Sequence, residues 1–206
     1  MLAAIILHVA LGGAALACAG DQKGSTIFAD QFADDSGGWD LTGATVQPPN
    51  MIFNVGGDVA LAKAALNQTF NATDGDYCVD IILPAGTSAD NSVGGGLVVW
   101  AADYRNMYTF QVFSNGVVGL WRLVNKEWST IFKGADLQLV KPYSTNNLHV
   151  VIKDGLITMS VNGKEVKKVR AQTPPGPLRF GLRAQSMPMP GTVDVKFQNF
   201  KVTSGS

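Results

Sequence analysis

The stretch Asn146–Arg170, which reads NNLHVVIKDGLITMSVNGKEVKKVR, decides the fold class of this chain. Apolar and polar residues alternate in it over two runs, whose apolar members are Leu148, Val150 and Ile152 and then Ile157, Met159 and Val161. Alternation with a period of two is typical of strands that bury one face. Asp154-Gly155 follows the first run and Asn162-Gly163 the second, and both pairs favour the positive φ angles of two-residue hairpin turns. The stretch therefore predicts three consecutive antiparallel strands.

Further strands are predicted on both sides of this stretch. A second series of hairpins runs from Gly94 to Ile131 and contains the turn Asn115-Gly116. Its strands, and the others expected, cover about residues 26–32, 51–55, 59–64, 77–83, 97–100, 107–113, 117–123, 128–132, 178–184 and 193–202. Pro174–Pro177 and Met187–Gly191 are expected to be loops, because proline cannot donate a hydrogen bond to a central ladder.

The composition agrees with a protein made of strands. The chain has 206 residues, of which 46% are hydrophobic, and its 23 glycines and nine prolines separate short apolar stretches. After the first nineteen residues no helical periodicity lasts three turns, and there is neither a fixed repeat nor a low-complexity linker. We expect one all-β domain over residues 25–203, built as a two-sheet antiparallel β-sandwich.

The charge balance excludes some classes of partner. Sixteen basic residues offset sixteen acidic ones, and no cluster of Lys and Arg is dense enough to bind phosphates. We therefore expect no nucleic-acid partner.

The first nineteen residues predict export. Leu2–Ala19 carries no charge and ends in small residues, as a secretory signal peptide does, although it lacks the usual early Lys or Arg. Cleavage gives a secreted or periplasmic protein; two alternatives are lipid attachment at Cys18, after an imperfect lipoprotein box, and a retained anchor. No later segment is apolar enough to span a membrane. In the two favoured cases Cys78 is the only remaining thiol, which predicts a buried structural cysteine and no disulfide within the chain.

The chain resembles laminin-G-like, concanavalin-type jelly rolls over nearly its whole length after the signal segment. The residues that carry this resemblance are Phe28, Asp30, Gly38-Trp39, Gly94–Trp100, Tyr108–Phe110, Ile157–Lys164, Gly181-Leu182 and Val195–Val202. The resemblance implies the fold but not the function, because the superfamily contains lectins, carbohydrate-binding and adhesion modules, family-16 glucanases and keto-disaccharide hydrolase-like domains.

The sequence lacks the usual catalytic patterns. Family-16 glucanases carry two catalytic glutamates on one strand, and that motif is missing here: Glu127 and Glu165 both lie at predicted hairpin turns. His149 is the only histidine after the signal segment and is interpreted as an ordinary strand residue. We predict no catalytic residues, and the missing glutamate motif favours a binding module over an enzyme.

Calcium is the one cofactor that the sequence suggests. Asp30 on the first strand and Asp194 on the last lie near each other if the two termini pair, and carboxylates are ligands that calcium prefers. The alternative interpretation is that both are ordinary surface carboxylates, so that no cofactor is bound.

One face of the predicted sandwich has the composition of a sugar platform. If Tyr108, Phe110 and their period-two neighbours point into the core, Trp100, Gln111 and Trp121 point outward together. Indoles stack on sugar rings while amides bind hydroxyl groups. Tyr104, Arg105 and Asn106 in the adjoining loop are expected to line the edge of this platform.

The alternative interpretation of that face is a core covered by loops, and Trp39 and Trp128 are interpreted as structural. The preferred function is a secreted, non-catalytic module that binds a glycan or another extracellular polymer through this aromatic face. Two other functions stay open: a glycoside hydrolase-like enzyme acting on a disaccharide or keto-disaccharide, and an adhesion or assembly protein of the cell envelope. The oligomeric state is not predicted.

Overall fold

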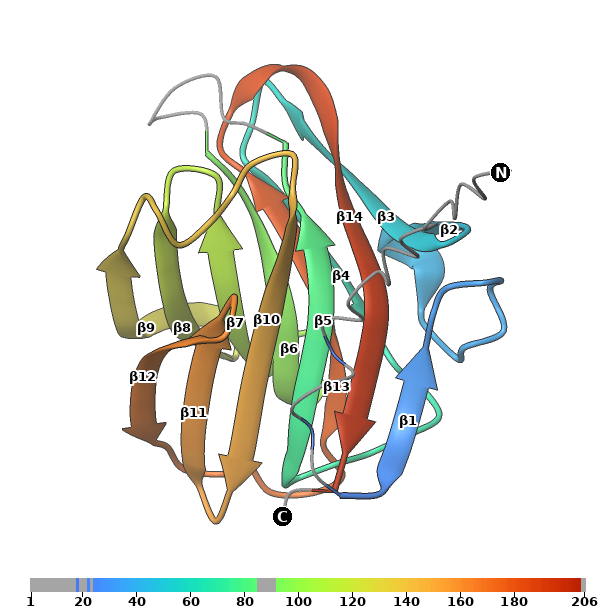
Figure 1. Ribbon diagram of the computed structural model, residues 1–206, viewed down its shortest axis with the longest axis vertical. Coiled ribbons are helices and arrows are strands. Elements are labelled where there is room, and N and C mark those ends of the chain that lie inside the picture. The colour runs from blue at the N-terminus through green and yellow to red at the C-terminus, as the bar shows by residue number, and fades with distance from the viewer. Residues whose placement is uncertain (1–17, 19–21, 23, 85–91, 205–206) are drawn as a thin grey trace, which may run out of the picture.

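Fourteen short strands in two antiparallel sheets account for almost all regular structure in the described part of the chain (Figure 1). The computed structural model describes Cys18, Gln22 and residues 24–84 and 92–204. Eight strands form the larger sheet: β1 (Thr26–Asp30), β2 (Thr45–Gln47), β3 (Asn50–Gly57), β5 (Gly75–Ile82), β10 (Thr145–Lys153), β11 (Leu156–Val161), β12 (Lys164–Arg170) and β14 (Met189–Thr203). Six form the smaller sheet: β4 (Leu61–Leu66), β6 (Val93–Asp103), β7 (Asn106–Phe113), β8 (Val117–Val124), β9 (Glu127–Ala135) and β13 (Arg179–Ser186).

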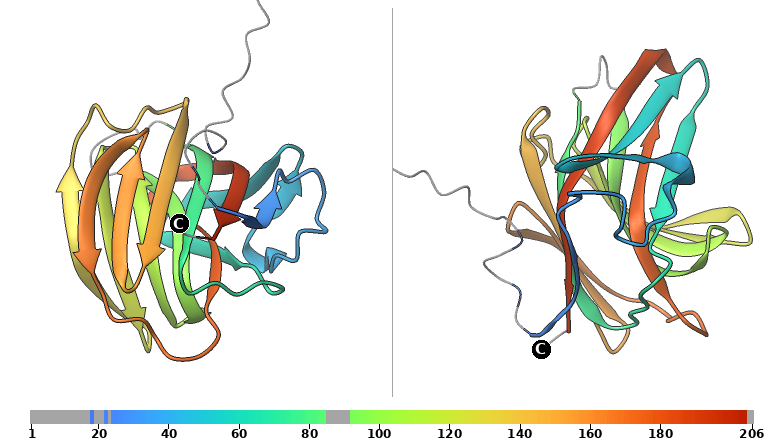
Figure 2. Two further views of the ribbon diagram at one scale, coloured as in Figure 1. Left: turned by 60° about the horizontal axis from the view of Figure 1, so that its bottom comes forward. Right: turned by 90° about the vertical axis from the view of Figure 1, so that its right-hand side faces the viewer.

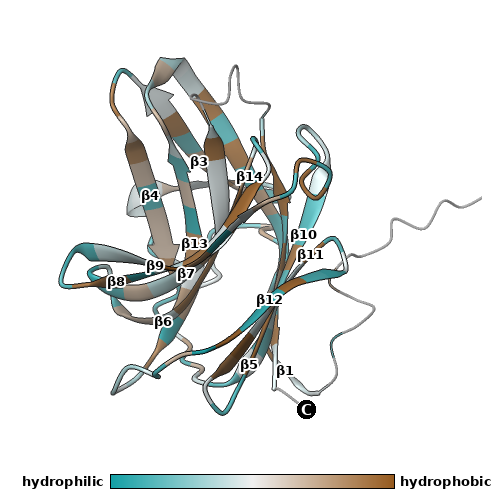
Figure 3. Cartoon of the chain, turned by 90° about the vertical axis from the view of Figure 1, so that its left-hand side faces the viewer, coloured by the Kyte–Doolittle hydropathy of each residue, from teal (hydrophilic) through white to brown (hydrophobic). Residues whose placement is uncertain are grey.

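The order of the strands mixes local hairpins with long-range pairs. The larger sheet runs β12-β11-β10-β5-β14-β3-β2, with β1 also paired to β14, and the smaller one runs β4-β13-β6-β7-β8-β9. Figure 3 shows the two sheets edge-on as two layers. The predicted all-β, two-sheet antiparallel sandwich is confirmed.

The stretch that predicted the fold forms the hairpins expected of it. In β10 and β11, Leu148 lies opposite Val161 and Val150 opposite Met159. Asp154 and Asn162 have φ angles of 51° and 50°, so the two turns adopt the left-handed conformation that Asp-Gly and Asn-Gly favour.

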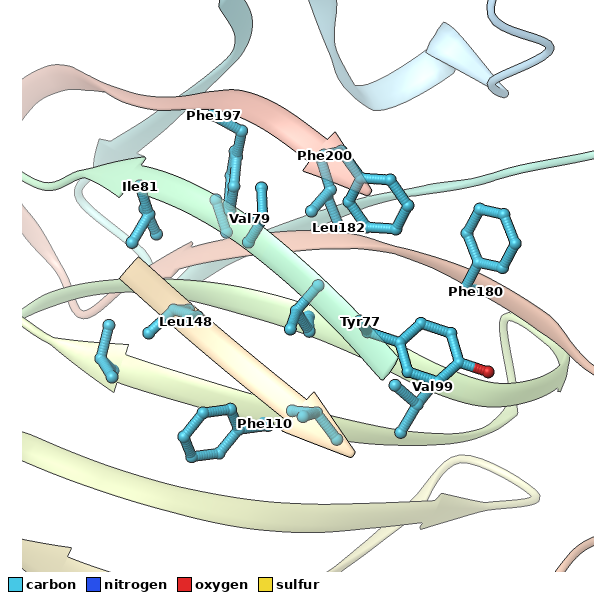
Figure 4. Close-up of a cluster of buried hydrophobic side chains, with 14 of the residues drawn as sticks. Tyr77, Val79, Ile81, Val99, Phe110, Leu148, Phe180, Leu182, Phe197 and Phe200 are labelled. Atoms are coloured by element: carbon cyan, nitrogen blue, oxygen red, sulfur yellow. The ribbon is translucent and has the colours of Figure 1, made fainter. Parts of the chain in front are cut away.

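The core fills the space between the sheets with one large apolar cluster. Figure 4 shows members of it from both layers: Tyr77, Val79 and Ile81 on β5 face Val99, Phe110 and Leu182 of the smaller sheet. At the end where β1 lies, Phe180 stacks on Phe200 with ring centroids 5.3 Å apart, and Trp39 meets Phe200 edge-on. Both sheets therefore contribute every second side chain of their strands to the core, as the alternating sequence predicts.

The last strand, β14, connects three neighbours. Its first half, Met189–Phe197, pairs with β3, its last residues pair with β1, and its second half, Lys196–Thr203, pairs with β5. It begins at Met189, inside a segment expected to be a loop; a register shift between Met189 and Thr192 accommodates Pro190 and Gly191 beside β3.

The expectation of a chain without a disulfide is wrong. Cys18 and Cys78 form a disulfide that spans 60 residues and ties the chain before β1 to the outer face of the larger sheet. Asn147 on β10 donates its amide to Cys78 Sγ at 3.0 Å and to Asp80 Oδ1 at 3.1 Å. The expectation failed because it assumed that Cys18 leaves with the signal peptide or carries a lipid.

Beside the disulfide, the larger sheet carries a polar pair. His149 Nε2 lies within hydrogen-bond distance of Asp76 Oδ1, and the Gln22 amide donates to the same oxygen at 3.0 Å. The contact of Gln22 with Asp76 anchors the N-terminal segment, and His149 lies on strand β10, as the sequence predicted. Apart from Cys18, the predicted signal segment lies outside the described residues, among which no helix is long and apolar enough to cross a membrane.

Candidate binding site

The outer face of the six-stranded sheet is concave. In Figure 2 (right) and in Figure 3 the β8–β9 hairpin bends away from the larger sheet, so the outer face curves between this hairpin and the strands β4 and β13. A concave sheet collects outward side chains from several strands around one space, as ligand sites commonly require.

The strand register places two polar residues and two glycines in one row across this face. Arg183 on β13 lies opposite Gly96 on β6, Gly96 opposite Gln111 on β7, and Gln111 opposite Gly119 on β8. Residues that are directly opposite in neighbouring strands share a face. Neither glycine leaves open space, because an added Cβ would lie 2.0 Å from the Phe110 carbonyl oxygen at Gly96 and 2.7 Å from the Trp121 ring at Gly119.

A pocket of about 310 Å³ lies over this row. It is lined by Gln111, Trp121, Trp128, Thr130, Arg183 and Gln185. This volume is at the lower end of the range for small-molecule sites, and its mixture of indoles and hydrogen-bonding groups is typical of them.

Arg183 is the most unusual residue of the pocket. Its side chain is almost fully buried at 8% exposure, and Nη1 donates to Gln111 Oε1 at 3.2 Å and also contacts Gln185 Oε1. The guanidinium lies over the Trp128 ring, with Cζ 4.9 Å from the centroid. Burial lowers the pKa of Arg183 to about 10, because desolvation disfavours the charged form, and the group still carries its charge at neutral pH. None of the ion pairs found among the described residues includes it.

Gln111 contributes a donor without a partner. The side chain is 2% exposed, and its Nε2 has no hydrogen-bond partner, whereas its Oε1 accepts from Arg183. The guanidinium fixes this orientation, since arginine only donates and must face the amide oxygen. The amide N–H groups of Gln111 therefore have no hydrogen-bond partner among the described residues.

The two tryptophans bound the pocket from β8 and β9. The Trp121 indole lies above Gly119, where an added Cβ would be 2.7 Å from the ring, and it meets Phe113 edge-on. Trp128 is 45% exposed. The prediction that Gln111 and Trp121 share an outer face agrees with this arrangement, whereas Trp128, interpreted as structural from the sequence, also lines the pocket.

Trp100 does not belong to this site, contrary to the prediction. It is fully buried in the main core, its Nε1 donates to the Thr73 carbonyl at 2.6 Å, and its ring meets Tyr108 edge-on. The register between β6 and β7 shifts after Val99, and Trp100 has a φ of 51°. This bulge reverses the alternation, so that Val99 and Trp100 both point inward.

The predicted edge residues stabilise a turn instead. The Tyr104 hydroxyl donates to Asp40 Oδ2 at 2.8 Å and accepts from the Leu66 amide. Asp103 accepts from the Arg105 amide and from the Asn106 side chain, and Asn106 Oδ1 accepts from the Asn125 amide at 3.1 Å. These residues join the β6–β7 and β8–β9 turns. None of the three lines the pocket of Gln111; Asn106 borders a separate hollow of about 300 Å³ beside Pro174 and Pro175.

The two aspartates proposed for calcium are not brought together. Asp30 lies opposite Phe200 of β14, whereas Asp194 is six residues earlier on that strand, roughly 20 Å away at the usual rise per residue. Asp30 accepts from the Trp39 indole at 2.8 Å and Asp194 from the Asn54 amide at 3.0 Å. The pairing of β1 with β14 was expected, but not its register, which separates the two carboxylates.

Carboxylates are scarce on the six-stranded sheet. Its only acidic residues are Asp103 and Glu127, both beside turns at one end. Glu127 lies opposite Val124 and alternates with Trp128, so it does not share the face of the pocket.

The sequence missed Arg183, Gln185 and Thr130. Strand β13 was predicted, and the burial of Leu182 and Ala184 makes Arg183 and Gln185 the outward residues of its alternation. The sequence did not reveal which strand lies beside β13: it pairs with β6, where Arg183 lies opposite Gly96, 87 positions earlier in the chain.

Comparisons with known proteins agree on the fold. No protein-family model and no curated protein matches the sequence of this chain. Solved structures do match. The carbohydrate-binding module CBM66 from Bacillus subtilis is 17% identical, with a TM-score of 0.65 over 81% of this chain and 96% of that one. The β-glucanase of Bacillus licheniformis is 10% identical, with a TM-score of 0.64 over 89% and 100%.

A third similar structure is the carbohydrate recognition domain of Emp47p, which is 14% identical with a TM-score of 0.63 over 89% of this chain and 98% of that one. The likeness to these structures confirms the jelly-roll fold that the sequence predicted. At these identities the likeness establishes the fold alone.

Proposed function

We propose that this chain is an exported, non-catalytic module that binds a glycan in the concave pocket of its six-stranded sheet. One observation carries the proposal: Trp121 and Trp128 bound the same pocket as the amide of Gln111 and the guanidinium of Arg183. The apolar face of a sugar ring stacks on an indole, while amide and guanidinium groups bind its hydroxyl oxygens.

Two further findings support this assignment. The structures with the same fold include a carbohydrate-binding module and a carbohydrate recognition domain. The pocket also combines an exposed indole, Trp128, with a buried polar floor, so a ligand gains both apolar contact and directed hydrogen bonds.

The pair of carboxyl groups that the hydrolase alternative requires is missing from the described residues of this face. Retaining glycosidases need two carboxyl groups about 5 Å apart across the scissile bond. On the six strands of this sheet the only acidic residues are Asp103 and Glu127, and neither lines the pocket. In this proposal, the chain therefore shares with the β-glucanase its fold and not its activity.

A glycan array with purified protein, followed by calorimetry on each hit, tests the proposal. We expect Trp121→Ala and Trp128→Ala to weaken binding at least about tenfold, since an aromatic contact of this kind is worth roughly 1 kcal/mol beyond its buried area. Tyr143→Ala is the matched control, because Tyr143 is 73% exposed and does not line the pocket.

The proposal fails if the folded wild-type protein binds no glycan. It also fails if the two tryptophan variants bind as tightly as Tyr143→Ala does. Release of reducing sugar from a bound oligosaccharide would contradict the non-catalytic part.

A further inference from the structure

The charge in the pocket narrows the class of ligand. A buried guanidinium is normally paired with a carboxylate, because removing a charge from water costs several kcal/mol unless a counter-charge compensates. Among the described residues, Arg183 has only neutral partners: two glutamine oxygens and the face of Trp128. The site thus holds a positive charge that no described side chain neutralises.

A second, independent observation points into the same space. Gln111 Nε2 is buried and unpartnered, and Arg183 holds the amide oxygen, so the free N–H groups of Gln111 and the guanidinium border one pocket. An acceptor with two oxygens satisfies both groups together, one oxygen on each donor.

We propose that the pocket binds an acidic sugar through an anionic oxygen group, either a uronate carboxylate or a sulfate ester, held by Arg183 and Gln111 Nε2. This inference rests on the proposed glycan-binding function. Trp121 and Trp128, which line the same pocket, then contact the ring that carries the acidic group.

The distribution of charge on the sheet agrees with an anionic ligand. Lys133 on β9 lies opposite Gly119 and so extends the row that contains Gln111 and Arg183. The acidic residues of the sheet, Asp103 and Glu127, lie at the end that carries the β6–β7 and β8–β9 turns. An incoming anion therefore meets cations at both ends of the row and no carboxylate between them.

Matched ligand pairs test the inference. The probes are oligogalacturonate, oligoglucuronate and oligomannuronate, each beside its methyl ester, and sulfated galactan oligosaccharides beside their desulfated forms. We expect the wild-type protein to bind at least one acidic member and to lose about tenfold to a hundredfold in affinity when that group is esterified or removed. The uronate and sulfate arms distinguish the two sources of charge, and affinity should fall as salt is added.

Variants of Arg183 separate a binding role from a structural one. Arg183→Met keeps an unbranched apolar stem of similar volume to that of arginine and removes the uncompensated charge. We therefore expect it to lose the preference for acidic over neutral probes while its melting temperature stays the same or rises. Arg183→Lys keeps the charge without the planar fork and should retain part of the preference.

Three outcomes overturn the inference. The first is that a probe and its ester bind equally well, in which case glycan binding stands and the acidic class does not. The second is that Arg183→Met lowers the melting temperature and leaves the preference unchanged, which makes Arg183 structural. The third is that acidic peptides bind and acidic glycans do not. If no glycan of any kind binds, the proposed function fails together with the inference.

Discussion

Arg183 and Gln111 are 72 positions apart in sequence, yet a 3.2 Å hydrogen bond joins the guanidinium to the amide oxygen across the side-chain-free Gly96. Each side chain determines what the other offers to a ligand. Gln111 presents its N–H groups because Arg183 holds its oxygen. The charge of Arg183 is not neutralised, because the described side chains that accept its hydrogen bonds are neutral amides.

Replacement of Gln111 by glutamate should close the pocket to anions. The carboxylate would form a charge-assisted hydrogen bond with Arg183, which is worth about 1.5–3 kcal/mol, and would repel an acidic ligand. We expect Gln111→Glu to unfold at a higher temperature and to lose acidic glycan binding, as measured by differential scanning calorimetry and titration. Unchanged affinity for an acidic probe would contradict this prediction.

The tryptophans should divide into structural and binding residues. Trp100→Ala removes a fully buried indole with a hydrogen bond to Thr73, and we expect the free energy of unfolding to fall by about 3–5 kcal/mol. Trp128→Ala, at a half-exposed position, should change it by less than about 1 kcal/mol while weakening ligand binding. Urea denaturation of both variants measures the difference; equal losses of stability would contradict the inward orientation of Trp100.

The disulfide predicts the state of the N-terminal segment. Because Cys18 pairs with Cys78, protein from an oxidising compartment should show no titratable thiol and should lose about 2–4 kcal/mol of stability on reduction. The same pairing is incompatible with a lipid thioether on Cys18, since the sulfur cannot do both.

Thiol titration of the denatured protein and its intact mass measure the state of both cysteines. Cys78→Ser should destabilise as reduction does. A free Cys78 thiol in the wild-type protein, with Cys18 absent from the mass, would mean that the segment is removed.

Tyr104 should contribute to stability in a way that depends on pH. Burial raises the pKa of Tyr104 from its ordinary value of 10 to about 12. Between these values the unfolded chain releases the proton and the folded chain retains it, so the contribution of Tyr104 is complete below pH 10 and is lost as the pH rises toward 12.

At neutral pH, Tyr104→Phe should cost about 1 kcal/mol, because the hydrogen bonds to Asp40 and to the Leu66 amide are lost. This deficit should shrink between pH 10 and pH 12 in urea denaturation series. Tyr143→Phe, at an exposed position, serves as the control and should show no such trend. A deficit that is constant with pH would contradict the assignment.

The sequence by itself determined the class of the fold and most of its strands. Period-two alternation and the Asp-Gly and Asn-Gly turns are local signals, so β10, β11 and β12 and the hairpins from β6 to β9 could be read from neighbouring residues. The same local reasoning placed Gln111 and Trp121 on one outer face, because a single hairpin relates them.

Only the tertiary structure decided the composition of the pocket. Arg183 reaches Gln111 because β13 pairs with β6, and the pairing of strands far apart in the sequence depends on how the whole core packs, which no local pattern encodes. Trp100 points inward because a bulge interrupts the alternation, and Cys18 pairs with Cys78 across 60 positions of sequence. In each case the deciding contact joins residues that only the assembled sheets bring together.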